Sequence, residues 1–418
     1  MTAYRGQLRV GNGAPVAAAI EPNDSGVALS PEGGSPTELA YVDIEDLHDA
    51  DYVLRLTDHT GQTYELTMLG RAYGQVLEDV RKAREARLEK DLLLRGVGLQ
   101  DTIPGKLFGG EQPVPVRLRL YEDLLVAIPE RGTMFGIPYA FVEEVVWDEE
   151  LYQVRVRTDL GEEHVFGHLG RRSEELRDEL RRLIAALERR TAATLRALLP
   201  GSEPGLVTRL ASMMRDGRVV QRRRVDALAP QLWGALEDAV AGTPELRAAY
   251  DDLSSVAGWT AFGIKAVRPA AADGPADAPD PEPTGSGARA DLWYLCPLAR
   301  EGRPLNAAAQ EVTSEPGHAT YVFRLMEPAR FASLSGEALA DEVERSLALL
   351  NRALLQLNFR REPIYLSDEQ IAADERYARY RVALRKLPHL RRARASFLGR
   401  AAHDAGWRRR IDELAASA

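Results

Sequence analysis

The sequence predicts an α+β protein whose N-terminal half contains one β-rich module twice and whose remainder is a mainly helical α+β region. Residues 27–84 and 126–183 share letters and the order of their elements, about 100 residues apart. In each copy, alternating apolar runs give way to apolar residues spaced three or four positions apart. Alternation predicts strands, and the longer spacing predicts an amphipathic helix. The change occurs at Leu69-Gly70-Arg71 in the first copy and at Leu169-Gly170-Arg171 in the second.

Composition sets the broad class of the protein. A chain of 418 residues with 45% hydrophobic content can bury several cores, and its length suggests two to four domains. The net charge of −9 argues against nucleic acid as a partner of the whole molecule. A lone Cys296, predicted to lie in the core, excludes an intrachain disulfide and a cysteine-ligated zinc site, and it fits a reducing cytoplasm. The N-terminus lacks the apolar region of a signal peptide, so we expect a cytoplasmic protein without membrane insertion.

In the first copy, three apolar runs predict strands at 39–47, 52–56 and 64–68. Residues 58–61 read Asp-His-Thr-Gly, which is typical of a hairpin turn. From Tyr73 the apolar residues follow a helical spacing as far as Gly96. The first copy therefore predicts strands followed by one helix.

The second copy repeats this order. Ser173 is the expected N-cap of its helix, with acids in the first turn where the helix dipole favours them. Pro200 and Gly201 end that helix. The predicted strands cover 118–120, 124–128, 141–147, 152–156 and 164–166.

Several antiparallel strands followed by one amphipathic helix, within roughly 90 residues, resemble the pleckstrin-homology (PH) superfold in its GRAM-like, small bacterial form. The resemblance is carried by residues 41–47, the hairpin, the Leu69-Gly70-Arg71 triplet and their equivalents in the second copy, and it covers 4–199. It implies two tandem PH-like β-barrels, at 1–96 and 97–200, each closed by a C-terminal helix. The alternative is two unrelated β-rich domains of similar spacing.

Residues 201–418 are predicted to form a C-terminal α+β domain. A strand at 259–267 is expected to pair with one at 292–296 across an insert at 269–290, whose five Pro, three Gly and four acids predict disorder. The rival reading places a domain boundary at this insert. The other expected elements are helices at 206–214, 225–240, 244–253 and 337–359, a strand at 320–325, and a basic helical hairpin at 367–414 broken by Pro388.

Motifs for chemistry are weak. Gly11-Asn12-Gly13 lacks the third glycine and the following helix of a dinucleotide site, so we interpret it as a turn. His164 and His168 lie too far apart on an extended chain to share a metal. Ser314, His318 and Glu311 lie in a turn-rich segment without the geometry of a catalytic triad. The sequence therefore predicts no catalytic residue, no cofactor and no metal. The acid clusters at 43–46, 49–51 and 148–150 are interpreted as solvated turns.

Arginine is concentrated near the C-terminus. This set is either a charged helix surface that contacts proteins or a site for nucleic acid or another polyanion. The candidate partner-binding residues are Arg376, Arg379, Arg385, Lys386, Arg391, Arg392, Arg394 and Arg400.

The leading functional expectation is a non-enzymatic scaffold that binds protein partners through tandem PH-like modules. Phosphoinositide binding is not expected, because the loops at 21–24 and 122–123 are acidic and repel phosphate. The alternatives are a nucleic-acid-associated factor acting through the basic hairpin, and an enzyme with an unrecognised site in the C-terminal region.

Overall fold

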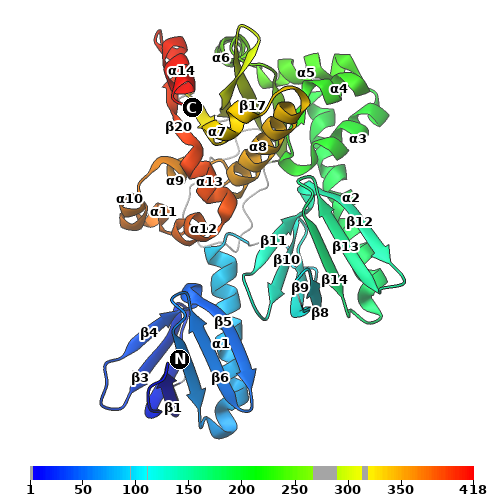
Figure 1. Ribbon diagram of the computed structural model, residues 1–418. Coiled ribbons are helices and arrows are strands. Elements are labelled where there is room, and N and C mark those ends of the chain that lie inside the picture. The colour runs from blue at the N-terminus through cyan, green and yellow to red at the C-terminus, as the bar shows by residue number, and fades with distance from the viewer. Residues whose placement is uncertain (1–2, 95, 111, 267–289, 313–318) are drawn as a thin grey trace. The chain divides into compact units, whose positions relative to one another are not determined.

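The structure is a computed structural model that describes residues 3–94, 96–110, 112–266, 290–312 and 319–418. It is mixed α+β, as expected, with two seven-stranded antiparallel sheets and one six-stranded sheet (Figure 1). The chain groups into two compact units. The first unit contains Met1–Arg181 and Arg379–Ala383, and the second contains Arg182–Ala378 and Leu384–Ala418.

The first module has seven strands and one helix, α1 (Tyr73–Asp91). The strands are β1 (Tyr4–Val10), β2 (Val16–Pro22), β3 (Gly26–Pro31), β4 (Thr37–Ala40), β5 (Ile44–Ala50), β6 (Val53–Asp58) and β7 (Thr63–Thr67). They lie in the order β4-β3-β2-β1-β7-β6-β5, so β1 joins the two halves of the sheet. Strands β4 and β5 remain as its two edges, and the sheet is open where the sequence reading expected a closed barrel.

The second module repeats this topology and ends in α2 (Arg172–Leu198), a helix that continues into the second unit. Its strands are β8 (Asp101–Phe108), β9 (Val114–Leu120), β10 (Leu124–Pro129), β11 (Phe135–Pro138), β12 (Val142–Asp148), β13 (Gln153–Thr158) and β14 (Glu163–Gly167). Their order, β11-β10-β9-β8-β14-β13-β12, matches the first sheet strand for strand, and this sheet is open too. The duplication predicted from the sequence is therefore confirmed as a duplication of topology.

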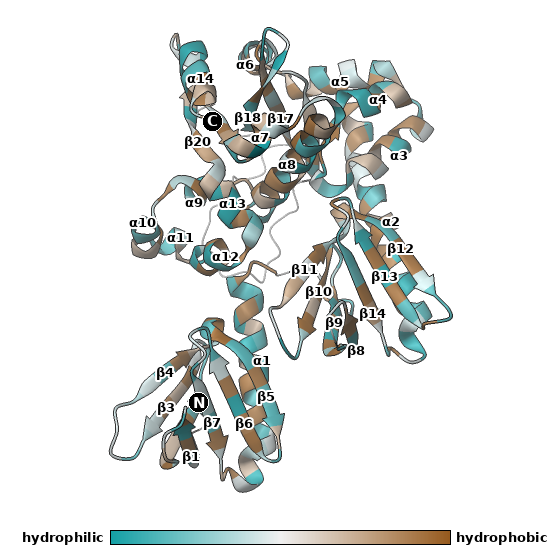
Figure 2. Cartoon of the chain, in the orientation of Figure 1, coloured by the Kyte–Doolittle hydropathy of each residue, from teal (hydrophilic) through white to brown (hydrophobic). Residues whose placement is uncertain are grey.

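Hydrophobic and hydrophilic residues alternate along many strands of both sheets, which buries one face of each (Figure 2). In the first module Leu54, Leu56 and Leu66 are fully buried, together with Val76 and Val80 of α1. The three- and four-residue spacing along α1 thus marks the helix face that packs on the sheet.

A glycine in the first strand of each module makes room for the Leu-Gly-Arg triplet. A Cβ atom on Gly6 would lie 2.9 Å from Cδ2 of Leu69, and one on Gly105 would lie 2.5 Å from Cδ2 of Leu169. Both leucines are buried. A Cβ atom would also lie 2.7 Å from the carbonyl oxygen of Thr67 at Gly6 and 3.1 Å from that of Gly167 at Gly105, so glycine favours the same close packing in both copies.

The second unit is built on a sheet with the strand order β15-β16-β17-β18-β19-β20. The strands are β15 (Val220–Gln221), β16 (Ala261–Ala266), β17 (Ala290–Arg300), β18 (Arg303–Val312), β19 (Ala319–Arg324) and β20 (Phe397–Ala402). Strands β16 and β17 pair antiparallel from Ala261 opposite Leu295 to Ala266 opposite Ala290, so the predicted pairing across the insert is confirmed. The predicted disorder of the insert concerns residues that lie, apart from Ala290, outside the described part of the chain.

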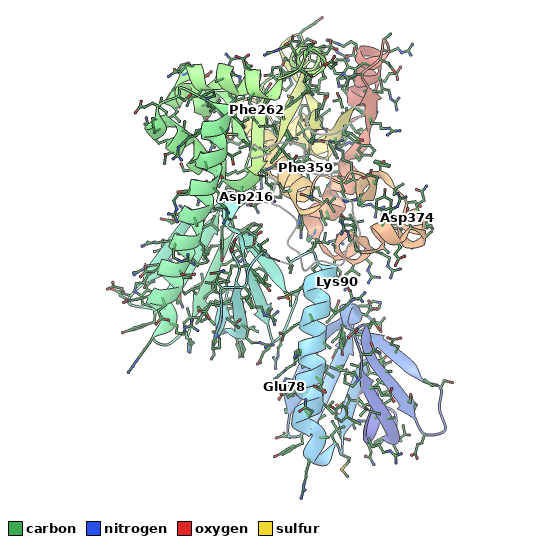
Figure 3. The ribbon with its side chains drawn as sticks, turned by 180° about the vertical axis from the view of Figure 1, so that it is seen from behind. Glu78, Lys90, Asp216, Phe262, Phe359 and Asp374 are labelled. Atoms are coloured by element: carbon green, nitrogen blue, oxygen red, sulfur yellow. The ribbon has the colours of Figure 1, made fainter. Side chains whose placement is uncertain are left out.

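Helices cover both faces of this sheet. On one face Trp233 stacks on Phe262 with ring centroids 4.5 Å apart. On the other, Trp293 packs against Phe359 at 4.3 Å (Phe262 and Phe359 are labelled in Figure 3). The helices of this unit are α3 (Pro204–Met213), α4 (Arg222–Leu228), α5 (Pro230–Val240), α6 (Pro244–Ser254), α7 (Pro328–Ser333), α8 (Gly336–Gln356), α9 (Glu362–Tyr365), α10 (Asp368–Ala373), α11 (Glu375–Ala378), α13 (Pro388–Ser396) and α14 (Trp407–Ala416). Helix α12 (Arg381–Lys386) is divided between the units, with Arg381–Ala383 in the first.

Two predictions for this unit are wrong. The helix expected at 225–240 is two helices, because Pro230 begins α5 and holds Ala229 in an extended conformation, with φ −167° and ψ 110°. The basic helical hairpin expected at 367–414 is a series of short helices interrupted by β20, which pairs with β19. Tertiary pairing overrides the local helical preference of that segment.

A buried side chain of α8 connects two separate parts of this unit. Asn351 accepts a hydrogen bond from Nε1 of Trp293 (3.0 Å) and donates one to the carbonyl oxygen of Gly217 (2.8 Å). We predict that Asn351→Leu destabilises the unit by about 2–4 kcal/mol, because it leaves both buried partners unsatisfied. The check is the urea midpoint of the full chain followed by tryptophan fluorescence. The matched control, Asp341→Leu, changes an exposed position of the same helix, and equal midpoints for the two variants would refute this role.

Candidate interaction surfaces

The first module carries a cluster of exposed side chains at one end of its sheet, which we call the first tip and define as Asp51, Tyr52 and Met68. Tyr52 lies in the turn between β5 and β6, and Met68 follows β7. The pairing of Leu54 with Leu66 places Tyr52 opposite Met68. Their exposed fractions are 77% and 76%. Two large side chains that the core does not use therefore stand side by side.

The second module has an equivalent second tip, formed by Leu151, Tyr152 and His168. Gln153 pairs with Gly167, so Tyr152 lies opposite His168, as Tyr52 lies opposite Met68. Tyr152 is 67% exposed and Leu151 58% exposed. The exposed tyrosine is thus present at the same structural position in both copies.

Ring contacts hold these side chains in place. Tyr52 meets Tyr73 edge to face, with centroids 5.4 Å apart, and Tyr152 meets Trp147 in the same manner at 5.9 Å. The His168 ring stacks on Phe108 at 5.8 Å. The tyrosines are exposed but supported by aromatic neighbours.

The backbone of both tips is strained. Left-handed φ angles occur at Asp51 (51°), Tyr52 (61°), Met68 (56°), Tyr152 (52°) and His168 (55°). In this conformation a non-glycine residue costs about 1–2 kcal/mol, and hairpin turns of this kind favour Asn and Gly. Strain kept at exposed side chains that do not serve the core is typical of functional positions.

Carboxylates surround the tips. Asp51, Glu149 and Glu150 are exposed, as predicted for solvated turns, whereas Asp46, Asp49 and Asp148 of the same clusters are half-buried residues of strands β5 and β12. Asp49 pairs with Arg81 at 2.5 Å, and Asp148 pairs with Arg155 at 2.6 Å. The acids closest in sequence to the exposed tyrosines therefore point to solvent, which disfavours contact with an anionic surface.

The predicted partner-binding residues are spread over several elements. Arg376 lies on α11, Arg385 and Lys386 on α12, Arg391, Arg392 and Arg394 on α13, and Arg400 on β20, while Arg379 lies between α11 and α12.

Several of these residues have partners within the chain. Arg376 pairs with Asp374 (labelled in Figure 3) at 2.6 Å, and Arg394 pairs with Asp368 at 2.5 Å. Arg392 donates to the carbonyl oxygen of Leu325. Arg379 donates to the Tyr380 hydroxyl at 2.6 Å. Arg391 and Arg400 are exposed. The structure does not gather the set on one helical hairpin.

A buried polar cluster in the second unit was not found by sequence reasoning. Glu311 is 2% exposed and hydrogen-bonds Nε2 of His403 at 2.9 Å. The Thr320 hydroxyl donates to Glu311 and accepts from Nε1 of Trp407. The hydrogen bond that Nε2 of His403 donates to the Glu311 carboxylate raises the pKa of His403 above its ordinary value. Since 92 residues separate this acid from its histidine, no local spacing could reveal the pair.

The other candidate residues from the sequence either have structural roles or lie outside the described part of the chain. His164 stacks on Phe135, and no group of three or more His, Cys, Asp or Glu side chains within the described residues is arranged to hold a metal. Ser314 and His318 lie outside the described residues. Cys296 is buried, as expected. None of the described helices is both long and apolar enough to cross a membrane.

Comparison with known proteins identifies no family for this chain. No protein-family model matches the chain, and no curated protein is similar to it. Among solved structures, the crystal structure of the C-terminal domain of an unknown protein from Leishmania infantum is similar over 24% of this chain and 97% of that one, at 15% identity. Its TM-score of 0.22 is too low to assign a fold.

Replacing Met68 tests the strain at the first tip. We predict that Met68→Gly stabilises the first module by about 1 kcal/mol, because glycine adopts a left-handed φ without steric cost. Met68→Ala keeps the strain and serves as the control. The measurement is the melting temperature of the full chain. If Met68→Gly melts at no higher a temperature than Met68→Ala, the position is unstrained.

The Glu311–His403 pair predicts a pH dependence. Because the folded-state pKa of His403 is raised, the pair contributes fully below the unfolded-state pKa of about 6.5, and its contribution is lost as the pH rises through the folded-state pKa. Between pH 5 and pH 9, the urea concentration at the midpoint of unfolding should fall more for the native protein than for His403→Gln. His59→Gln, at an exposed histidine, should keep the native profile. Identical profiles for His403→Gln and the native protein would contradict this.

Proposed function

We propose that this protein is a non-enzymatic, cytoplasmic interaction protein whose two PH-like modules bind partner proteins through their tips. The observation that carries the proposal is the exposed tyrosine, held in a left-handed backbone conformation at the same position of both modules. A tyrosine buries about 150–250 Å² when covered, and tyrosine is enriched among the residues that dominate binding energy. This backbone conformation is energetically unfavourable and occurs in both modules. A role in binding explains it best, because it does not stabilise the fold.

The PH-like reading is supported by the order of elements. Each module consists of seven antiparallel strands followed by one helix, and its first strand lies between the second and the seventh. The edge strands β4, β11 and β12 add backbone groups to which an extended peptide can bind, whereas β5 already forms a bridge between Asp46 and Arg131.

Phosphoinositide binding is disfavoured in this proposal. The acidic segments at 21–24 and 122–123 lie where the second strand of each module gives way to the third. The loops between the first two strands are 11–15 and 109–113, and neither contains Lys or Arg. Without basic residues there, these two loops lack side chains that could pair with the phosphates of a phosphoinositide.

The nucleic-acid alternative has weaker support. It requires cations free to contact phosphate, and each cation engaged by an acid reduces that contribution. Arg376 and Arg394 are engaged in this way, whereas Arg391 and Arg400 remain exposed. We therefore place this function second.

Photo-crosslinking tests the tip proposal. A photoreactive phenylalanine at position 52 or 152 should crosslink the same partner in cells that produce the protein. Control substitutions at Glu32 and Thr133, which are exposed in the β3–β4 and β10–β11 loops, should not. Changing both tyrosines to serine should weaken binding of the captured partner at least about tenfold, or about 1.4 kcal/mol. Equal crosslinking from the control positions would reject the tips as the binding surface.

A further inference from the structure

A cavity of about 660 Å³ lies within the first unit, between α1 of the first module and strands β8 to β10 of the second. This volume is in the range of small-molecule sites. Glu78, labelled in Figure 3, marks the stretch of α1 that forms one wall. Neither the tips nor the C-terminal arginines line this cavity. A ligand of the cavity would therefore bind apart from the proposed partner proteins.

The lining combines an apolar surface with a cationic one. The apolar part includes Leu47, Leu77, Val116, Ile128 and Pro129. The basic residues that line the cavity are Arg81, Lys82, Arg84, Arg117 and Arg119, and the acids are Glu78, Glu85 and Glu130. A ligand that matches this lining has an apolar body and a negatively charged group.

Arg84 is the strongest indication of a missing partner. Its side chain is 9% exposed, Nη2 donates to the carbonyl oxygen of Ile44 at 3.0 Å, and Nε has no hydrogen-bond partner among the described residues. Burial lowers the pKa of this guanidinium, which the charge of Asp46 offsets only in part. A buried, unsatisfied N–H costs about 1–3 kcal/mol, which an anionic acceptor in the cavity would recover.

Arg117 provides a second cationic group. It lies near Arg119 and Arg81, and burial followed by repulsion from these two lowers its pKa. Glu85 contacts both Arg117 and Arg119, Glu89 contacts Arg119, and Arg81 pairs with Asp49. These acids hold the guanidinium groups in place. Since each guanidinium has five N–H donors, donors remain for an anion.

We propose that this cavity is a binding site for a small amphiphilic anion, a carboxylate or phosphate head group on an apolar body. The head group is bound by Arg84 and Arg117, and the apolar body lies against Leu77, Val116 and Ile128. Because residues of both modules line the cavity, such a ligand stabilises the first unit when bound.

Calorimetric titration of the full chain tests the proposal with four probes. Decanoate and decyl phosphate should bind, whereas decylamine, with the same chain and the opposite charge, and inorganic phosphate, with no apolar body, should bind at least about tenfold more weakly. Comparison of decanoate with decyl phosphate distinguishes the two head groups. Equal binding of decanoate and decylamine, or phosphate alone as tight as decyl phosphate, would overturn the proposal.

Two variants locate the site. Arg117→Gln removes one cation and should weaken both anionic probes at least about tenfold, while Arg157→Gln, at an exposed arginine of β13 paired with Glu144, should not. Gly74→Phe fills the cavity from α1. Gly74 lines the cavity, and no atom of the described residues lies within 4 Å of an added Cβ, so a larger side chain can begin there without a clash at Cβ.

Gly234→Phe is the matched control for cavity filling, because Gly234 is an exposed helical glycine of α5 with equally open surroundings. Loss of binding in Gly74→Phe but not in Gly234→Phe, with native circular dichroism for both, supports the site. Undiminished decanoate binding by Gly74→Phe overturns it, even if Arg117→Gln fails to fold.

Discussion

Each N-terminal module depends on the pairing of its first strand with its last. Strand β1 pairs with β2 on one side and with β7 on the other, and β8 pairs in the same way with β9 and β14. This non-local contact unites two runs of local hairpins into one sheet. It also brings Gly6 and Gly105 against Leu69 and Leu169, so that the chain can leave the sheet and begin the covering helix.

The tips are a consequence of this framework. The register that buries Leu54 and Leu66 on one face places Tyr52 and Met68 at the end of the sheet, where the chain must turn. The core fixes the position of these side chains but gains nothing from their exposed surface. The left-handed backbone there is held by the paired strands on either side of it.

The buried polar contacts also depend on residues that are distant in the sequence. Glu311 with His403, and Asn351 with Trp293 and Gly217, join segments that are far apart in sequence within the second unit. In the first unit, Glu85 and Glu89 of α1 reach Arg117 and Arg119 of β9, and the amphiphilic cavity lies beside these ion pairs. Burial strengthens the contacts of Glu311 and Asn351 and makes the loss of one partner costly there, whereas the Arg117 side chain is 47% exposed.

The sequence alone determined the α+β class, the duplicated module, the long helices and the pairing of β16 with β17, because periodic burial and repetition are local signals. It did not reveal β18, whose central Ala307, Ala308 and Ala309 show no alternation, or β20, whose strand form depends on β19. The repetition of Tyr52 as Tyr152 was present in the sequence as a signal for the tips. Only the tertiary structure decided the open sheet edges, the Glu311–His403 pair and the cavity. Neither the order of strands in a sheet nor a contact between residues tens of positions apart produces a periodic pattern in the sequence.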